Sequence, residues 1–123
     1  MPTTLLAMTK TVVQGQTVIG LYFSADWCPP CRHFTPLLTK LYANKRAHCT
    51  PTNRNIPLFE VVLMSRCHET EAMDRYFATM PWAAMTHAAA LGELGTALRD
   101  RFSVTTIPAL IILDGEGTVI CSN

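Results

Sequence analysis

Long apolar runs are absent from this chain of 123 residues. The longest, residues 18–23 and 109–113, are far shorter than the roughly 20 apolar residues that a membrane-spanning helix needs. The start of the chain also lacks the apolar core of a secretory signal, because only residues 5–8 are apolar and Lys10 follows closely. We therefore expect a soluble protein that is not secreted and has no membrane partner.

An excess of charge of one sign is also missing. Ten lysines and arginines stand against nine aspartates and glutamates, which gives a formal net charge of +1. The basic residues are scattered along the chain, whereas a nucleic-acid-binding domain gathers them in a patch or stripe. Nucleic acid is therefore not an expected partner.

A complete set of paired cysteines is excluded by their number. The chain has five cysteines, and secreted frameworks stapled by disulfides use even sets. Free thiols are typical of reducing compartments, where one pair can cycle between dithiol and disulfide, so we expect a cytoplasmic protein. Cys49 and Cys121 are interpreted as incidental thiols, while the role of Cys67, just past a strand pattern, stays open.

The length fits one domain, residues 1–123, that buries roughly two-thirds of the surface exposed by the unfolded chain. Strand patterns occupy residues 18–23, 58–64, 109–113 and 118–121, and helical spacing of apolar residues occupies 32–47, 69–79 and 91–102. The polar stretch 48–57 is interpreted as a surface connection. A right-handed crossover makes the first two strands parallel, and the Asp-Gly turn at residue 114 makes the last two antiparallel. The sequence therefore predicts an α/β domain with a mixed central sheet flanked by helices.

The first predicted helix carries two further expectations. Its buried stripe should consist of Phe34, Leu37, Leu38 and Leu41, which follow helical spacing. Pro36 lies inside the helix, where it removes one backbone hydrogen bond and should bend the axis.

Two cysteines stand one helical turn apart where a strand pattern passes into a helix pattern, in the sequence Trp27-Cys28-Pro29-Pro30-Cys31. The free N–H groups and dipole of a helix N-terminus favour an anion, so Cys28 should form a thiolate readily and act as a nucleophile. Cys31 lies deeper on the same face and can attack the mixed disulfide that Cys28 forms. This spacing predicts a dithiol-disulfide exchange site.

The two prolines between the cysteines suit the first turn of a helix, because the N–H groups they lack would be unpaired there. The alternative for such a pair is half of a zinc site, with Cys67, His68 or Cys49 as further ligands. The chain has no second pair at this spacing, and zinc knuckles use the N–H groups that the prolines remove. We therefore expect no metal and no bound cofactor.

Residues 21–32, followed by Phe34-Thr35-Pro36, resemble the tryparedoxin and nucleoredoxin branch of the thioredoxin superfamily. Further stretches agree in order: residues 59–65, residues 76–82, Ile107-Pro108-Ala109-Leu110 and residues 114–117. The resemblance covers about residues 11 to 121 of this chain.

The resemblance implies a thioredoxin fold whose exchange site is formed by Cys28 and Cys31. By this resemblance, Trp27 and Pro29 would border the site, and the loop with Ile107 and Pro108 would face it. The Ile107–Pro108 peptide bond is expected to be cis, which lets Ile107 offer backbone groups to an extended peptide. Thioredoxins proper carry a buried acid six residues before the first cysteine, where this chain has Tyr22. Either a chain of water molecules or the Tyr22 hydroxyl is therefore expected to support deprotonation of the inner thiol.

The chain departs from the family pattern in three places. Arg66-Cys67-His68 follows Ser65, where the family often has an acid, and Thr86 stands in place of a usual proline. Family members also continue past the last hairpin into another helix, whereas this sequence stops at Asn123. Without that helix an apolar face of the sheet would be left open. We therefore expect a truncated product, a dimer that shields this face, or local disorder.

The resemblance implies a thiol-disulfide oxidoreductase that reduces protein disulfides. Its expected electron donor is a small dithiol such as trypanothione or a reductase, and its expected acceptors are peroxiredoxin-type peroxidases. Two alternatives stay open: a nucleoredoxin-like signalling protein whose site senses oxidation while a surface binds a partner, and a metal or iron-sulfur carrier.

Overall fold

The computed structural model describes residues 18–47, 59–114 and 116–122. Its elements in chain order are β1 (Val18–Ser24), α2 (Pro29–Ala47), β2 (Phe59–Ser65), α3 (Thr70–Phe77), β3 (Ala83–Ala84), α4 (His87–Leu91), α5 (Glu93–Arg101), β4 (Ala109–Leu113) and β5 (Val119–Ser122). The predicted connection at residues 48–57, with Cys49, lies outside the described residues.

The five strands form one mixed sheet in the order β3-β2-β1-β4-β5. β1 pairs in parallel with β2 and antiparallel with β4, while β5 pairs antiparallel with β4. These relations confirm the mixed sheet and both predicted strand directions. β1 and β2 lie at the centre, and their side chains are almost all buried on both faces, as continuous apolar strands require.

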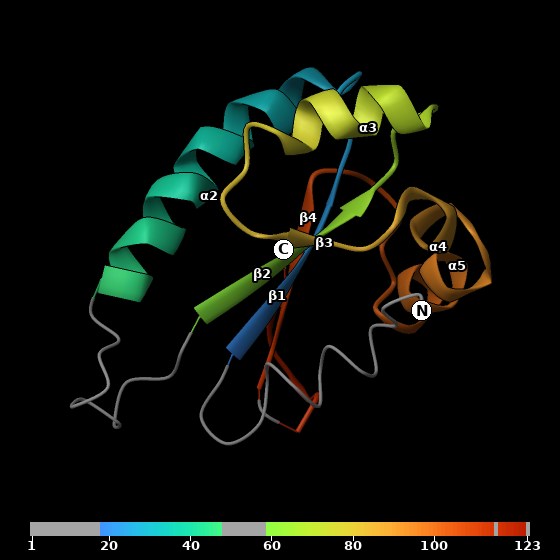
Figure 1. The fold of residues 1–123 in the computed structure, drawn as a ribbon. Helices are drawn as coiled ribbons and strands as arrows, with labels where there is room; N and C mark the ends of the chain where they lie inside the picture. Colours follow the sequence, from blue (N-terminus) through green and yellow to red (C-terminus); the bar gives the residue numbers. More distant parts are fainter. Residues whose placement is uncertain (1–17, 48–58, 115, 123) are drawn as a thin grey trace.

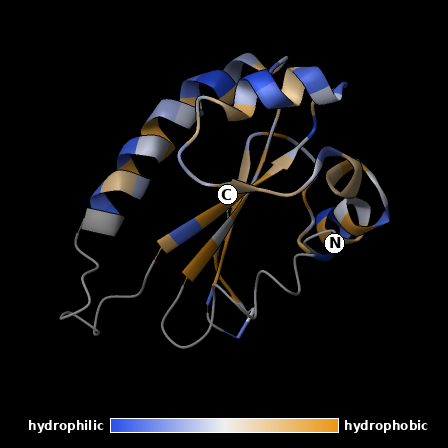
Figure 2. Ribbon diagram, in the orientation of Figure 1, coloured by the Kyte–Doolittle hydropathy of each residue, from blue (hydrophilic) through white to orange (hydrophobic). Residues whose placement is uncertain are grey.

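Helices cover the sheet from two sides, with α2 and α3 on one face and α4 and α5 on the other (Figure 1). The core is accordingly split in two. One cluster joins Tyr22, Val61 and Leu63 to Leu38 of α2 and Tyr76 of α3. The other joins the alternate residues of the same strands, including Leu21 and Val62, to α4 and α5. Hydrophobic residues are concentrated in the strands, whereas hydrophobic and hydrophilic residues alternate along the helices (Figure 2).

The prediction of which face of α2 is buried is wrong, because the helix is rotated about its axis relative to the predicted orientation. Leu38 is buried at 1% exposure, but Leu37 is 62% exposed and Leu41 is also exposed. The buried face instead runs through residues 31, 35, 38 and 42, which are Cys, Thr, Leu and Tyr. Hydropathy missed this face because the Thr and Tyr side chains are polar, yet their hydroxyl groups are hydrogen-bonded inside the protein.

The helix boundaries also differ from the predictions in two places. α2 begins at Pro29, so both prolines occupy its first turn, and the helix continues through Pro36. The helix predicted at 91–102 is present as α5, and the short helix α4, which was not predicted, precedes it and ends at Gly92, whose backbone is extended with φ −90° and ψ −157°. A Cβ atom at Gly95 would overlap the carbonyl oxygen of Ala90, so the close approach of α4 and α5 depends on a residue without a side chain.

The predicted hairpin between β4 and β5 is present. The Asp114 side chain accepts hydrogen bonds from the backbone N–H groups of Glu116 and Thr118, both at 2.9 Å. β5 is exposed along its whole length, and no helix follows it within the described residues, which run to residue 122. Of the helices in those residues, none has the length and apolar character to span a membrane.

Candidate active site

Cys28 and Cys31 lie where β1 passes into α2. The chain leaves β1 through a tight turn in which the N–H of Cys28 donates to the carbonyl of Ala25 at 3.3 Å. The carbonyl of Cys28 then accepts from Arg32 at 3.1 Å, which starts the helical pattern. Both thiols are free, with Cys28 at 5% exposure and Cys31 at 0%. The predicted order of depth, with Cys31 behind Cys28, is what the structure has.

The Cys28 sulfur has two polar neighbours. The backbone N–H of Cys31 donates to it at 3.3 Å, which is the contact expected of an unpaired amide in the first turn of a helix. The Cys28 thiol itself donates to the carbonyl of Ile107 at 3.8 Å. The amide favours negative charge on this sulfur, and Ile107 brings the loop before β4 to the reacting atom.

The Cys31 thiol is held in its protonated form. Two causes together raise its pKa from 9.0 to about 11: burial, which has the larger effect, and the hydrogen bond with Cys28. A hydrogen bond from the Ser24 side chain and one from the Ala25 backbone act in the opposite direction. The inner thiol therefore needs help to lose its proton at neutral pH.

Trp27 forms one side of the site. Its ring is 48% exposed, and its indole N–H donates to the carbonyl of Arg66 at 2.8 Å. The ring of His68 stacks on it with centroids 5.4 Å apart and an interplanar angle of 21°. The segment that departs from the family pattern, residues 66–68, thus holds the tryptophan in place.

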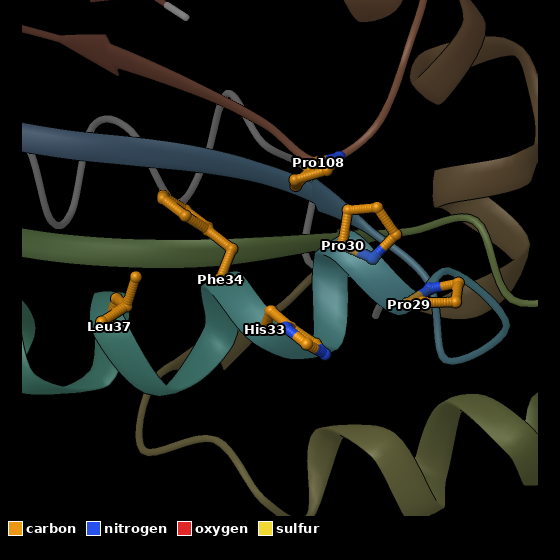
Figure 3. A pocket seen from close by; sticks show the side chains of 6 residues that line it. All are labelled: Pro29, Pro30, His33, Phe34, Leu37 and Pro108. Carbon is orange, nitrogen blue, oxygen red and sulfur yellow. The ribbon is translucent and has the colours of Figure 1, made fainter.

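Across the site lies the loop before β4, in which the Ile107–Pro108 peptide bond is cis, as expected. Pro108 faces the start of α2 over an apolar groove of about 560 Å³ (Figure 3). The residues that line this groove are Pro29, Pro30, His33, Phe34, Leu37 and Pro108. The predicted site residues Pro29 and Pro108 therefore come together, joined by Phe34 and Leu37, which the sequence had assigned to the core.

Four buried hydroxyl groups, which sequence reasoning did not bring together, lie behind the dithiol. The Tyr76 hydroxyl is 2.7 Å from that of Ser24 and 2.9 Å from that of Thr35, and the Thr35 hydroxyl is 2.7 Å from that of Tyr22. Tyr22 and Thr35 both donate to the carbonyl of Cys31, at 3.2 and 2.9 Å. Burial raises the pKa of Tyr22 far above its usual range, so this hydroxyl acts as a neutral donor. We call these four residues the hydroxyl cluster.

The remaining cysteines differ in environment. Cys67 is completely buried, and burial raises the pKa of its thiol. Cys121 is exposed on β5. In the part of the chain that the structure describes, no three His, Cys, Asp or Glu side chains gather where they could hold a metal ion.

The mixed sheet, the two thiols in the first turn of the helix that follows its central strand, and the cis-proline loop beside them define the class of thioredoxin folds. The chain belongs to the thioredoxin-like family, whose model matches residues 15–119.

Similar proteins lie in two groups, tryparedoxins and nucleoredoxins. Tryparedoxin of Trypanosoma brucei brucei is 39% identical over 109 residues, which cover 86% of this chain and 67% of that protein. Nucleoredoxin of Danio rerio is 34% identical over 111 residues, 90% of this chain but 24% of that protein, so the chain spans about a quarter of its length. The structure of tryparedoxin II complexed with glutathionylspermidine superimposes with a TM-score of 0.74 at 32% identity, covering 93% of this chain and 72% of that one.

Proposed function

We propose that this protein is a cytoplasmic thiol-disulfide oxidoreductase that uses Cys28 and Cys31 to reduce protein disulfides in the manner of a tryparedoxin. The single observation that carries the proposal is the contact of the Cys31 amide with the Cys28 sulfur at 3.3 Å, with the Cys31 thiol fully buried behind it. This geometry directs a backbone N–H at the outer sulfur and keeps a second thiol one turn away.

The proposed reaction has two exchange steps. The Cys28 thiolate attacks a substrate disulfide, forms a mixed disulfide with one substrate sulfur and releases the other as a thiolate. Cys31 then loses its proton and attacks the Cys28 sulfur, which forms the Cys28–Cys31 disulfide and releases the second substrate sulfur. Two electrons pass from the protein dithiol to the substrate, so the reaction needs no bound cofactor.

The surroundings of the dithiol support a polypeptide substrate. The segment at Ile107 and Pro108 leads into β4 and faces Cys28, so its backbone groups can pair with an extended peptide. Trp27 and Pro29 border the same opening and are exposed. In this proposal Tyr22 supports the site by donating to the Cys31 carbonyl.

The proposed electron donor is a low-molecular-weight dithiol such as trypanothione or a reductase, and the proposed acceptors are peroxiredoxin-type peroxidases. The support for them is similarity: 39% identity to a tryparedoxin, and a structural match to a tryparedoxin that holds glutathionylspermidine.

A second candidate function is redox-regulated partner binding, as a nucleoredoxin-like signalling protein with little turnover. The observation that favours it is the apolar groove beside Cys28, with Leu37 exposed at its end. Exposed apolar surface of this kind is typical of binding sites. Turnover separates the two candidates.

The test is reduction of insulin disulfides with dithiothreitol or trypanothione as the donor. We expect the native protein to accelerate the reaction and Cys28→Ser to abolish the acceleration, while Cys31→Ser should accumulate a mixed disulfide with the substrate. Cys121→Ser, which removes an exposed thiol on β5, is the matched control and should retain full activity. Equal rates for the native protein and Cys28→Ser would reject the enzymatic proposal in favour of the binding one.

A further inference from the structure

The second exchange step poses a problem of proton transfer at Cys31. While the mixed disulfide exists, the Cys28 sulfur is bonded to the substrate and cannot take up a proton. The Cys31 thiol is 0% exposed, so bulk water does not reach it, and a peptide over the site covers the front. The proton of Cys31 must therefore leave through the interior of the protein.

The hydroxyl cluster offers such an exit. Ser24, at the end of β1, is 0% exposed, and its hydroxyl lies 2.7 Å from that of Tyr76 on α3. The Ser24 side chain also lowers the pKa of the Cys31 thiol, against the larger effect of burial. Thr35 holds the Tyr76 hydroxyl at 2.9 Å and donates to the Cys31 carbonyl. The hydroxyl groups of Ser24, Tyr76 and Thr35 thus form a continuous chain that meets the backbone of Cys31.

The chain of hydroxyl groups ends at a cavity. Tyr76 and Thr35 line a space of about 540 Å³ whose other lining residues are Arg32, Pro36, Thr39, Lys40 and Thr79. This volume holds many water molecules. It shares no lining residue with the groove at Pro108, so a substrate bound at the groove leaves it open.

We propose that Ser24 and Tyr76 form a proton relay that carries the Cys31 proton to water in the cavity between α2 and α3 during the second exchange step. This inference rests on the proposed function. The Cys31 thiol gives its proton to Ser24, Ser24 passes its own to Tyr76, and Tyr76 passes its own to water. Both hydroxyl groups end neutral, the Cys31 thiolate attacks Cys28, and the departing substrate thiolate takes a proton from solvent.

The groups around Cys31 leave this route without a strong rival. The other titratable side chains of its core cluster are Cys28 in the preceding loop, Tyr22 on β1, Tyr42 on α2, Cys67 after β2 and Tyr76 on α3. Asp26, in the same loop, acts on the Cys67 thiol. Tyr22 is a neutral donor already directed to the Cys31 carbonyl, so Ser24 is the hydroxyl left to accept a proton from the sulfur.

The experiment follows the two steps separately with Ellman's reagent under single-turnover conditions, in a background of Cys121→Ser and Cys49→Ser. Attack by Cys28 releases one thionitrobenzoate, and attack by Cys31 releases the second. We expect Ser24→Ala and Tyr76→Phe to leave the first phase unchanged and to slow the second at pH 7 by about tenfold or more, since positioned acid-base groups contribute roughly 100-fold or more. Tyr42→Phe, which removes a buried hydroxyl of α2 bound to Glu60, is the matched control and should not slow it.

The pH profile distinguishes a relay from simple misplacement of the sulfur. The Ser24 hydrogen bond lowers the Cys31 pKa, so its removal should shift the second phase to higher pH, and the rates of variant and native protein should converge in alkali. Second phases equal to that of Tyr42→Phe, or slowed by one constant factor at every pH, would overturn the relay while the proposed function stands. Failure of the native protein to release a second thionitrobenzoate would instead overturn the proposed function.

Discussion

Cys31 is the residue at which burial and reactivity oppose one another. In the proposed reaction its sulfur must become a thiolate to attack the mixed disulfide, yet burial raises its pKa to about 11. Burial also keeps it away from other oxidants and from the substrate until Cys28 has reacted. In the proposed reaction, burial of Cys31 therefore slows ionisation of the inner thiol but ensures that Cys28 reacts first.

The raised pKa of Cys31 predicts how stability changes with pH. The folded protein resists ionisation of this thiol, whose pKa rises from 9.0 to about 11, so the reduced protein has its full stability below pH 9 and loses part of it as the pH rises toward 11. We expect the free energy of unfolding, measured with urea from pH 7 to 11, to fall more steeply for the native protein than for Cys31→Ala. Because Cys67 also has a raised pKa, the variant should retain a smaller decline. Parallel curves for the two proteins would contradict the assignment.

Trp27 illustrates how a residue keeps its place although its neighbours depart from the family pattern. The bond from its indole goes to a backbone carbonyl, that of Arg66, and any residue at position 66 supplies one. His68 then adds a stacked ring. The site border therefore tolerates the change from an acid to Arg66-Cys67-His68.

At the scale of elements, the orientation of α2 decides which side chains serve the core and which serve the groove. Leu38 is 1% exposed and Leu37 is 62% exposed, although they are adjacent and chemically identical. We expect Leu38→Ala to lower the free energy of unfolding by about 2–5 kcal/mol, because it leaves a cavity in the core. Leu37→Ala is the matched control and should change it by about 0.5 kcal/mol or less. Urea denaturation measures both, and similar losses would mean that the helix is rotated.

The meeting of α4 and α5 depends on glycine at one position. A side chain at Gly95 would overlap the Ala90 carbonyl oxygen, so Gly95→Ala should force the two helices apart and lower the melting temperature by several degrees, for a loss of about 1–3 kcal/mol. Gly92→Ala serves for comparison. Its Cβ would lie 2.8 Å from the Ala88 carbonyl oxygen, so the backbone must also shift there. An unchanged melting temperature for Gly95→Ala would contradict this packing.

At the scale of the whole molecule, apolar surface remains open at the edge of the sheet. Val119 and Ile120 of β5 are 42% and 55% exposed, and β5 forms one edge of the sheet. Exposed edge strands pair with other strands unless charged residues or a covering element prevent it.

We therefore expect the protein to associate with a second copy through β5, with Ile120→Lys shifting it to monomer. Light scattering measures the mass, and binding of a hydrophobic dye measures the open surface. Leu91→Lys, which adds the same charge at an exposed leucine of α4, is the matched control and should leave association intact. A native protein that is a monomer with little dye binding would contradict the prediction.

The sequence by itself determined what depends on residues close together in the chain. The spacing of Cys28 and Cys31 places them one turn apart in any helix that begins there, and the apolar runs at residues 18–23 and 58–64 predicted the strands β1 and β2. The Asp114 turn predicted the final hairpin in the same way. Short-range sterics and hydrogen bonds act alike in every tertiary context, so these features could be predicted.

Only the tertiary structure decided which side chains meet. Ser24 and Tyr76 are 52 positions apart, and their hydroxyl groups touch because the register of β1 and β2 and the docking of α2 and α3 bring them together. The same docking turned Thr35 and Tyr42 inward and left Leu37 and Leu41 outside. Hydropathy ranks each residue alone, whereas a buried hydroxyl is stable only with a hydrogen-bonding partner that a distant part of the chain supplies.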